Sequence, residues 1–579
     1  MKKGGITEEK GSRAVIFRVL SYLKPFKKEF LLAGILLALA TAIGFLQPLL
    51  IRQITDRGML AQDLPVLYRA VALLALLVAL NQAVEMAQTR LFVQVHNRSL
   101  YGIFRQVFQK LLRLKKPYFE DKNNAEILSF LQMDVSQVAS ITDRYTVMSV
   151  SYVFRIVSGL AGLLVISWKL TLIVLAMVPL KVLLVRRFSK RQEKAMDKMI
   201  ESSRDFSQWF GDNIEGIDEI KLWNLFESRE KAFQSRQRDL LALQKGNAMI
   251  DAWNTLWESL LEWSVTLLLY LAGGFLICRG GLTVGSVFAF VSYSWYVTGP
   301  VSALLNLKMY FARILPSARR LFRFLDMEPE PDTGTGRVGN RPPRLAFQDV
   351  SFAYQADRPI LQGACFHVEP GEKVAIIGQN GSGKSTVLNL LLRFYTPEAG
   401  EITADHVPVS RLALAGYRSL FSVVSQEPYL FLGDIAGNID LTGQASPEEV
   451  AAAMDTSGVA AYLQHMPQGE KTQVGRNGAR LSGGEKQKLA VARALLKDAP
   501  VVILDEATAG FDVESDAYLH DVIVNQMAGK SVIMITHHYE HLEGMDRVYR
   551  LEGGRLYEER REDGRAWGAS GAGEPSGQP

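Results

Sequence analysis

The chain has 579 residues, with 65 Lys and Arg against 60 Asp and Glu, and a formal net charge of +5. At roughly 100 to 200 residues per domain, this length predicts two or more units. The small positive excess is spread along a long chain, so we expect no nucleic-acid partner. Only two cysteines, Cys278 and Cys365, are present, which excludes a disulfide-framed scaffold and a cysteine zinc site.

The N-terminal half contains six apolar segments that predict membrane-spanning helices. The first has no charged residue and is long enough, at about 1.5 Å per residue, to cross a hydrocarbon layer about 30 Å thick. Lysines 24, 27 and 28 precede it, and the positive-inside tendency places the N-terminus in the cytoplasm. The predicted spans are Phe30–Ile51, Leu67–Val84, Tyr145–Trp168, Leu170–Val185, Trp263–Cys278 and Gly280–Leu307.

Two of these segments are interrupted by charge, the third by Arg155 and the fourth by Lys181, so buried core helices remain an alternative for that pair. The connections expected on the outer side are short turns, which favours membrane spans over buried core helices. The inner connections Glu85–Lys116 and Arg186–Lys245 are polar and contain few helix breakers, so we expect the spans to continue as helices into the cytoplasm. Six crossings place both termini in the cytoplasm, in a multi-pass protein of the plasma membrane.

The composition changes after Met327. Residues 328–343 are rich in Pro, Gly and charge, which predicts a linker. Short β-rich runs then alternate with helical stretches, the pattern of an α/β domain. We therefore predict a transmembrane domain over 1–327, a linker over 328–343, an α/β nucleotide-binding domain over 344–561 and a flexible tail over 562–579.

A phosphate-binding loop is predicted at Gly378–Thr386, which reads GQNGSGKST between an apolar strand and a helix. Backbone N–H groups of such a loop and the positive end of the following helix bind phosphate oxygens. The lysine reaches the outer phosphates, and the serine that follows it can ligate Mg²⁺. The expected ATP-binding residues here are Gly378, Gln379, Asn380, Gly381, Ser382, Gly383, Lys384, Ser385 and Thr386.

A second apolar strand, VVILDE, ends in Asp505 and Glu506. We expect Asp505 to hold Mg²⁺ through water, together with Ser385. Glu506 points the other way along the pleat and can polarise an attacking water, because phosphoryl transfer depends on positioning and charge neutralisation. With the phosphate loop upstream, this strand predicts an ATPase with ATP and Mg²⁺ as cofactors.

Between these motifs, LSGGE at Leu481–Glu485 opens a helix and forms a second anion-binding tip. The order of phosphate loop, Gln426, LSGG, Asp-Glu and a late histidine resembles the ATP-binding cassette. Six spans ahead of it resemble an exporter-type half-transporter, a multi-pass helical membrane domain joined to an α/β P-loop NTPase domain.

The resemblance implies further roles for individual residues. Tyr354 would stack on adenine, Gln426 would sense Mg²⁺ and the membrane domain, and His537 would contact the γ-phosphate beside the catalytic Glu506 and Lys384. Asp512 would lie at the dimer seam. The signature residues would act on ATP held by the partner; they are Ser482, Gly483, Gly484 and Glu485.

Two chains are therefore expected, as a homodimer or as a heterodimer with a second half-transporter. The resemblance also implies that short inner helices near Phe119–Glu126 and Asn213–Leu225 contact the cassettes. Glu485 stands where Gln is usual, and the seam reads AGFD instead of SALD, so the symmetry of the pair stays open.

Cargo is less well specified. Ionisable residues inside spans are candidates for function, and Glu85, Arg155, Glu258 and Glu262 qualify by position. They could line a cavity for amphipathic molecules, or the glutamates could pair with Arg155 or face cytoplasmic water. The leading interpretation is an ATP-driven exporter of an amphipathic small molecule, lipid or peptide in a lipid membrane. Siderophore-type import and an ATP-gated channel or regulatory receptor remain alternatives.

Overall fold

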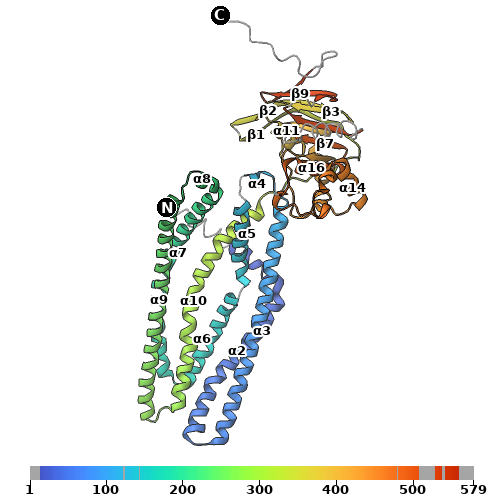
Figure 1. The fold of residues 1–579 in the computed structure, drawn as a ribbon. Helices are drawn as coiled ribbons and strands as arrows, with labels where there is room; N and C mark the ends of the chain where they lie inside the picture. The colour runs from blue at the N-terminus through green and yellow to red at the C-terminus, as the bar shows by residue number, and fades with distance from the viewer. Residues whose placement is uncertain are drawn as a thin grey trace. The chain divides into compact units, whose positions relative to one another are not determined.

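The computed structural model describes residues 14–120, 124–142, 144–355, 357–478, 480–506, 529–537 and 542–559. Asp512 and the predicted tail at 562–579 lie outside these residues. The chain forms two compact units, which are described separately (Figure 1). The helical unit comprises Met1–Leu114 and Asp121–Glu328, and the sheet unit comprises Lys115–Glu120 and Pro329–Pro579.

Long helices build the helical unit. Within the described residues, five helical segments are long and apolar enough to cross a membrane, namely Lys24–Leu60, Leu64–Leu111, Ser149–Ile166, Trp168–Glu215 and Phe226–Cys278. The sixth predicted span falls on α10, which is long enough but carries many Ser, Thr and Tyr side chains. The long helices are α2 (Lys27–Gln53), α3 (Leu64–Leu111), α6 (Arg144–Ile166), α7 (Trp168–Glu215), α9 (Phe226–Cys278) and α10 (Val284–Asp326).

Two predicted span boundaries are wrong, each because a cap or turn intervenes. The third span ends at Ile166, because Ser167 caps α7 by accepting a hydrogen bond from the backbone N–H of Leu170. The sixth helix begins at Val284 and not at Gly280, because Gly280 has a φ of +72° and makes a turn before the helix.

The inner extensions differ from one another. α3 continues to Leu111, as predicted from the polar stretch that follows the second span. The stretch 186–245 is not one continuous helix: α7 ends at Glu215, the short α8 (Ile217–Leu222) follows, and α9 starts at Phe226. Asn224 takes a φ of +51° between α8 and α9, which reverses the chain there.

Small residues allow α6 and α10 to pack closely. A Cβ on Gly162 would lie 2.6 Å from Cε1 of Tyr293, and one on Gly159 would lie 3.0 Å from Cβ of Tyr296. Tyr293 is fully buried, and its hydroxyl donates to the carbonyl of Phe45 on α2. These contacts make α2, α6 and α10 one packed group within the helical unit.

Two sheets build the larger segment of the sheet unit (Figure 1). The four-stranded sheet has the order β2-β1-β4-β5, and the six-stranded sheet has the order β10-β9-β3-β8-β7-β6. Their strands are β1 (Leu345–Gln355), β2 (Arg358–Val368), β3 (Lys373–Ile377), β4 (Ala399–Ala404), β5 (Val407–Pro408), β6 (Phe421–Val424), β7 (Val501–Asp505), β8 (Ser531–Thr536), β9 (Arg547–Glu552) and β10 (Arg555–Glu559).

The centre of the larger sheet is parallel. β3 pairs in parallel with β8 and β9, and β7 pairs in parallel with β6 and β8. These strands are almost wholly buried, as expected for parallel strands covered on both faces. Helices α11 (Lys384–Leu391) and α16 (Gly483–Lys497) contribute apolar side chains to this core. α14 (Pro447–Thr456) packs with α16 in a separate apolar cluster.

The beginning of the predicted linker is attached to the sheet unit. The guanidinium of Arg418 donates to the carboxylate of Glu330 at 2.9 Å, and the backbone N–H of Leu414 donates to Asp332 at 2.9 Å. Gly336 forms a parallel bridge with Leu412. These contacts begin directly after Glu328, so the segment is extended but held in place.

The sheet unit also contains Lys115–Glu120, which follows α3 in the chain and includes the one-turn helix α4 (Pro117–Glu120). The ammonium of Lys116 donates to Asn389 at 2.9 Å and lies 5.1 Å from the ring centroid of Phe394. The hydroxyl of Tyr395 donates to Glu120. This segment overlaps the inner connection that was predicted to contact the cassette.

Candidate nucleotide site and polar pockets of the helical unit

Four predicted site residues lie just after strands of the parallel sheet. β3, β6, β7 and β8 run in the same direction, so their carboxyl ends meet at one edge. Gly378, Gln426, Glu506 and His537 follow these four strands in turn. The sheet topology therefore brings together residues that are far apart in the sequence.

The loop between β3 and α11 has the conformation that a phosphate cradle requires. Gly381 and Gly383 have φ values of +79° and +108°, which favour glycine. A Cβ on Gly383 would lie 2.8 Å from Cγ2 of Ile360, so the backbone also approaches β2 closely. α11 starts at Lys384, and its N-terminal N–H groups and dipole therefore lie at the end of the loop.

Lys384 closes this loop. Its Nζ donates to the carbonyls of Gly378 at 2.8 Å and Gln379 at 3.1 Å, and only 6% of the residue is exposed. The buried Oγ of Ser382 has no hydrogen-bond partner among the described residues, so this hydroxyl is available to a phosphate oxygen. The loop and His537 line one side of a cavity of about 690 Å³.

Glu506 lies where three other predicted residues meet. One carboxylate oxygen accepts from Nε2 of Gln426 at 3.0 Å; the other lies 3.3 Å from Nδ1 of His537 and 3.9 Å from Nζ of Lys384. β7 ends at Asp505, and Glu506 has a φ of +47°, so the pleat does not set its direction as predicted. Its backbone N–H donates to the carbonyl of Ile535 and fixes the turn.

Asp505 provides a carboxylate beside this group. Burial raises its pKa above the ordinary Asp value, the neighbouring Glu506 carboxylate raises it further, and the Lys384 ammonium lowers it. A divalent cation would relieve the repulsion between the two carboxylates. A carboxylate, the hydroxyl of Ser385 and the amide oxygen of Gln426 are the oxygen donors that Mg²⁺ prefers, so this set of residues fits the cofactor.

Tyr354 lies at the end of β1, beside the start of α11. Its hydroxyl accepts hydrogen bonds from Thr386 at 3.3 Å and Asn389 at 3.2 Å. Its ring makes edge contacts with Phe352 and Tyr395, each at 5.0 Å between ring centroids. The residue remains exposed, so it can contact a base beside the phosphate loop.

The signature residues form a capping box at the start of α16. Ser482 Oγ accepts from the backbone N–H of Glu485 at 3.3 Å, while the Glu485 carboxylate accepts from the backbone N–H of Ser482 at 2.7 Å. Among the described residues that line the phosphate-loop cavity, none belongs to Ser482–Glu485. The N-terminus of α16 with its signature residues is therefore well formed, but it does not line the phosphate-loop cavity of its own chain.

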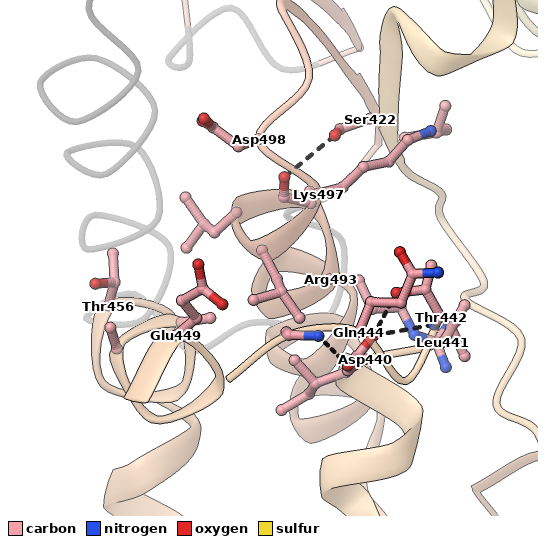
Figure 2. Close-up of a pocket in the computed structure, with 18 of the residues that line it drawn as sticks. Ser422, Asp440, Leu441, Thr442, Gln444, Glu449, Thr456, Arg493, Lys497 and Asp498 are labelled. Carbon is pink, nitrogen blue, oxygen red and sulfur yellow. Dashed lines mark hydrogen bonds between the residues drawn. The ribbon is translucent and has the colours of Figure 1, made fainter. Parts of the chain in front are cut away.

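A second, larger cavity of about 960 Å³ lies between β6, α14 and the C-terminal half of α16. Figure 2 shows Asp440, Thr442 and Arg493 on one side, across from Glu449 and Thr456. The cavity contains none of the phosphate-loop residues and has the exposed Leu441 in its lining. It is a separate hollow of the sheet unit that sequence patterns did not indicate.

The four predicted cavity residues of the helical unit divide into two sites. Arg155 on α6 lies 3.9 Å from Glu85 on α3. Glu262 on α9 instead pairs with Lys181 of α7, at 2.6 Å, and Glu258 accepts a hydrogen bond from Ser302 at 2.7 Å. The alternative that the glutamates of α9 pair with Arg155 is therefore wrong.

The sequence pattern shows Lys181 only as an interruption of a span and does not indicate that it is the partner of Glu262. The residue is 1% exposed, and its ammonium also donates to the carbonyl of Thr298 at 2.9 Å. A lone lysine in an apolar segment was the available signal, because a buried charge requires a partner. Nothing in the local sequence pointed to Asn81 and Gln88, which line a pocket with Glu85 and Arg155.

Comparisons with known proteins agree with this arrangement. The family model of the ABC transporter transmembrane region matches residues 30–301, and that of the ABC transporter matches residues 361–509. An ATP-dependent lipid A-core flippase of Thiobacillus denitrificans is 33% identical over 94% of this chain and 95% of its own length. A protein of the same name from Pseudomonas fluorescens is 31% identical, over 94% and 93%.

A solved structure of a bacterial Atm1-family ABC exporter with ATP bound has a TM-score of 0.78 to this chain. It is 23% identical and the match covers 92% of this chain and 95% of that one, so it shows that the fold is shared. The predicted fold class is thereby confirmed. The chain is a multi-pass membrane protein and an ATP-binding ATPase that couples hydrolysis to transport: it belongs to the ABC transporter family, as an exporter-type half-transporter with a C-terminal nucleotide-binding domain.

Proposed function

We propose that this chain is one half of a homodimeric, ATP-driven exporter that moves an amphipathic lipid across the plasma membrane. The observation that carries the proposal is the position of Glu506, whose carboxylate is held by Gln426, His537 and Lys384 beside the phosphate loop. The curated relatives are ATP-dependent flippases of lipid A-core, which supports a lipid as cargo.

In the proposed reaction, Glu506 orients and deprotonates a water that attacks the γ-phosphate. Lys384 and the loop N–H groups hold the β- and γ-phosphates, and His537 donates to the γ-phosphate as charge develops on it. Ser385, Asp505 and Gln426 would hold Mg²⁺, which neutralises phosphate charge when bound. Tyr354 stacks on the adenine ring.

Assembly as a pair follows from the separation of the signature from the phosphate loop. Ser482–Glu485 would complete the site of the second copy, so two copies of this chain build two complete sites. A homodimer is favoured because one chain supplies both the catalytic Glu506 and an ordered signature. Asp512 is assigned to the seam of this dimer.

The cavity beside Leu441 is proposed to receive α8 of the partner subunit. α8 and the residue after it expose Leu222 and Trp223, large apolar side chains at a point where the helices turn back. Burying them against Leu441 would link the cassette to the helical unit of the other chain. The cassettes and both termini are placed in the cytoplasm, since lysines precede the first span.

The proposal is tested with pure protein in liposomes that contain a headgroup-labelled fluorescent lipid. Wild-type protein with Mg²⁺ and ATP should move label between leaflets, measured by protection from a membrane-impermeant quencher. Glu506→Gln should bind ATP but lose turnover and lipid movement, by roughly 10²-fold or more. Glu401→Gln, an exposed acid on β4, is the matched control. Unchanged turnover in Glu506→Gln would contradict the assignment, and ATP turnover without lipid movement would point to a regulatory or channel function.

A further inference from the structure

Two hollows in the helical unit adjoin one another and differ in character. The first, of about 120 Å³, is polar and lies among α2, α3, α6 and α10. The second, of about 410 Å³, lies between α2 and α6. They share Thr41 and Ser158 in their linings, so the polar and the apolar hollow lie directly beside each other, and we treat them as the two parts of one site. The apolar part is lined by Ala38, Thr41, Ala42, Phe45, Leu46, Phe154 and Ser158.

The polar part presents one cation and one anion that are only loosely paired. The guanidinium of Arg155 lies 3.9 Å from the Glu85 carboxylate, beyond hydrogen-bond distance, and the two side chains are 47% and 37% exposed. Glu85 accepts a hydrogen bond from Asn81 at 3.4 Å. Nε2 of Gln88 is buried there without a hydrogen-bond partner among the described residues.

We infer that this site binds a single zwitterionic phospholipid, with its phosphate on Arg155, its ammonium on Glu85 and an acyl chain in the groove between α2 and α6. A guanidinium recognises phosphate oxygens through several N–H donors, and a carboxylate accepts from an ammonium. A zwitterion satisfies both charges without leaving a net charge within the span, where an unpaired charge is costly.

The size and position of the apolar part favour a lipid over a small polar solute. Apart from Thr41 and Ser158 at its border with the polar part, its wall is formed by alanine, leucine and phenylalanine side chains, which favour a hydrocarbon chain. The orphaned amide of Gln88 gives a further donor to a headgroup oxygen. The inference rests on the proposed function and adds the headgroup chemistry and the helix pair that holds the chain.

Binding is measured without ATP, by native mass spectrometry of the detergent-solubilised full chain, so that loss of hydrolysis cannot be mistaken for loss of binding. The ligands are phosphatidylethanolamine, phosphatidylglycerol with the same acyl chains, and dodecyltrimethylammonium. Wild-type protein should bind phosphatidylethanolamine roughly tenfold more tightly than either other ligand, since each lacks one of the two charge-assisted contacts.

Each part of the site has its own variant. Arg155→Gln should weaken phosphatidylethanolamine binding roughly tenfold, while Arg155→Lys keeps the cation and should retain the preference. Glu85→Gln should remove the preference over phosphatidylglycerol. Ala42→Trp fills the groove and should weaken binding of all three ligands, whereas Leu39→Trp, an exposed position on α2 outside the site, should not.

Three outcomes would overturn the inference: equal wild-type affinities for the three ligands, tighter binding of phosphatidylglycerol, or preferences that no variant changes. Failure of Glu506→Gln to abolish turnover would refute the proposed hydrolysis but leave these binding results intact. Conversely, a wild-type protein that hydrolyses ATP normally but shows no preference for phosphatidylethanolamine would refute the lipid site and leave the proposed hydrolysis intact. Thermal melting of each variant shows whether the chain has folded.

Discussion

Glu262 neutralises a lysine that is buried in the helical bundle, and removal of its charge is expected to destabilise the helical unit. Lys181 Nζ lies 2.6 Å from Glu262 and 2.9 Å from the carbonyl of Thr298, and the lysine is 1% exposed. Glu262→Leu leaves the ammonium with the carbonyl alone, and such a loss costs about 3–5 kcal/mol. Glu262→Gln retains an acceptor oxygen, so we expect a smaller loss of about 2 kcal/mol.

Glu258, one turn earlier on α9, is the matched control. It accepts hydrogen bonds from Asn254 at 2.8 Å and Ser302 at 2.7 Å, and no basic side chain of the described residues forms an ion pair with it. An amide oxygen can accept from one of the same donors. Glu258→Gln should therefore cost less than about 1 kcal/mol.

The assay is reversible SDS titration in mixed micelles, followed by the tryptophan fluorescence of the chain, to which Trp257 and Trp263 on α9 contribute. Glu258→Gln should lower the free energy of unfolding least, Glu262→Gln should lower it more, and Glu262→Leu should lower it most. Lys181→Met combined with Glu262→Leu should recover much of the loss, because no buried charge is left unpaired. Equal effects of Glu262→Leu and Glu258→Gln, or additive losses in the double variant, would refute this reasoning.

Three further predictions concern the sheet unit. Gly383→Ala should lower the free energy of unfolding of the sheet unit by about 1–3 kcal/mol and weaken ATP binding, because φ of Gly383 is +108° and a Cβ would lie 2.8 Å from Ile360. Both effects are measured by calorimetry, and Gly416→Ala, at a helical position with open space around the added Cβ, is the control variant. Since the pKa of Asp505 is raised, protons should compete with Mg²⁺ at a higher pH than for an ordinary Asp, so the apparent Mg²⁺ affinity in nucleotide-binding titrations should fall on acidification. Asp505→Asn should make this fall smaller than in the wild type, leaving the part that comes from protonation of the nucleotide phosphates. In a background without Cys278 and Cys365, Leu441→Cys with Leu222→Cys should give a disulfide-linked dimer on a non-reducing gel; a product that stays monomeric under oxidation would contradict the proposed seating of α8.

The signals that predict the nucleotide site are local. A phosphate loop is read from glycine spacing between a strand and a helix, and VVILDE marks a buried strand with carboxylates at its end. Parallel pairing of β3, β7 and β8 then places the loop beside Glu506 without any further information. The direction of Glu506 was not predictable, since the strand stops one residue earlier and the backbone turns.

The polar contacts of the helical unit could not be predicted from periodicity. Lys181 and Glu262 are 81 residues apart, and their pairing depends on how α7 and α9 are rotated about their axes. The hydropathy of each segment is almost insensitive to that rotation. The break at Gly216–Leu225 coincides with the short inner helix that the resemblance implied near Asn213–Leu225; the residues alone gave little sign of it, because one glycine and one asparagine are weak signals within a long polar stretch.

The attachment of residues 330–336 to the sheet unit limits the slack in one of the covalent links between the two units, the one that follows α10. α10 ends at Asp326 and the sheet unit begins at Pro329, so only Met327 and Glu328 intervene. Fully stretched, three residue steps reach about 11 Å. A cassette displaced by more than this distance must pull the end of α10 with it. The displacement is then transmitted to the last long helix instead of being absorbed by a slack linker.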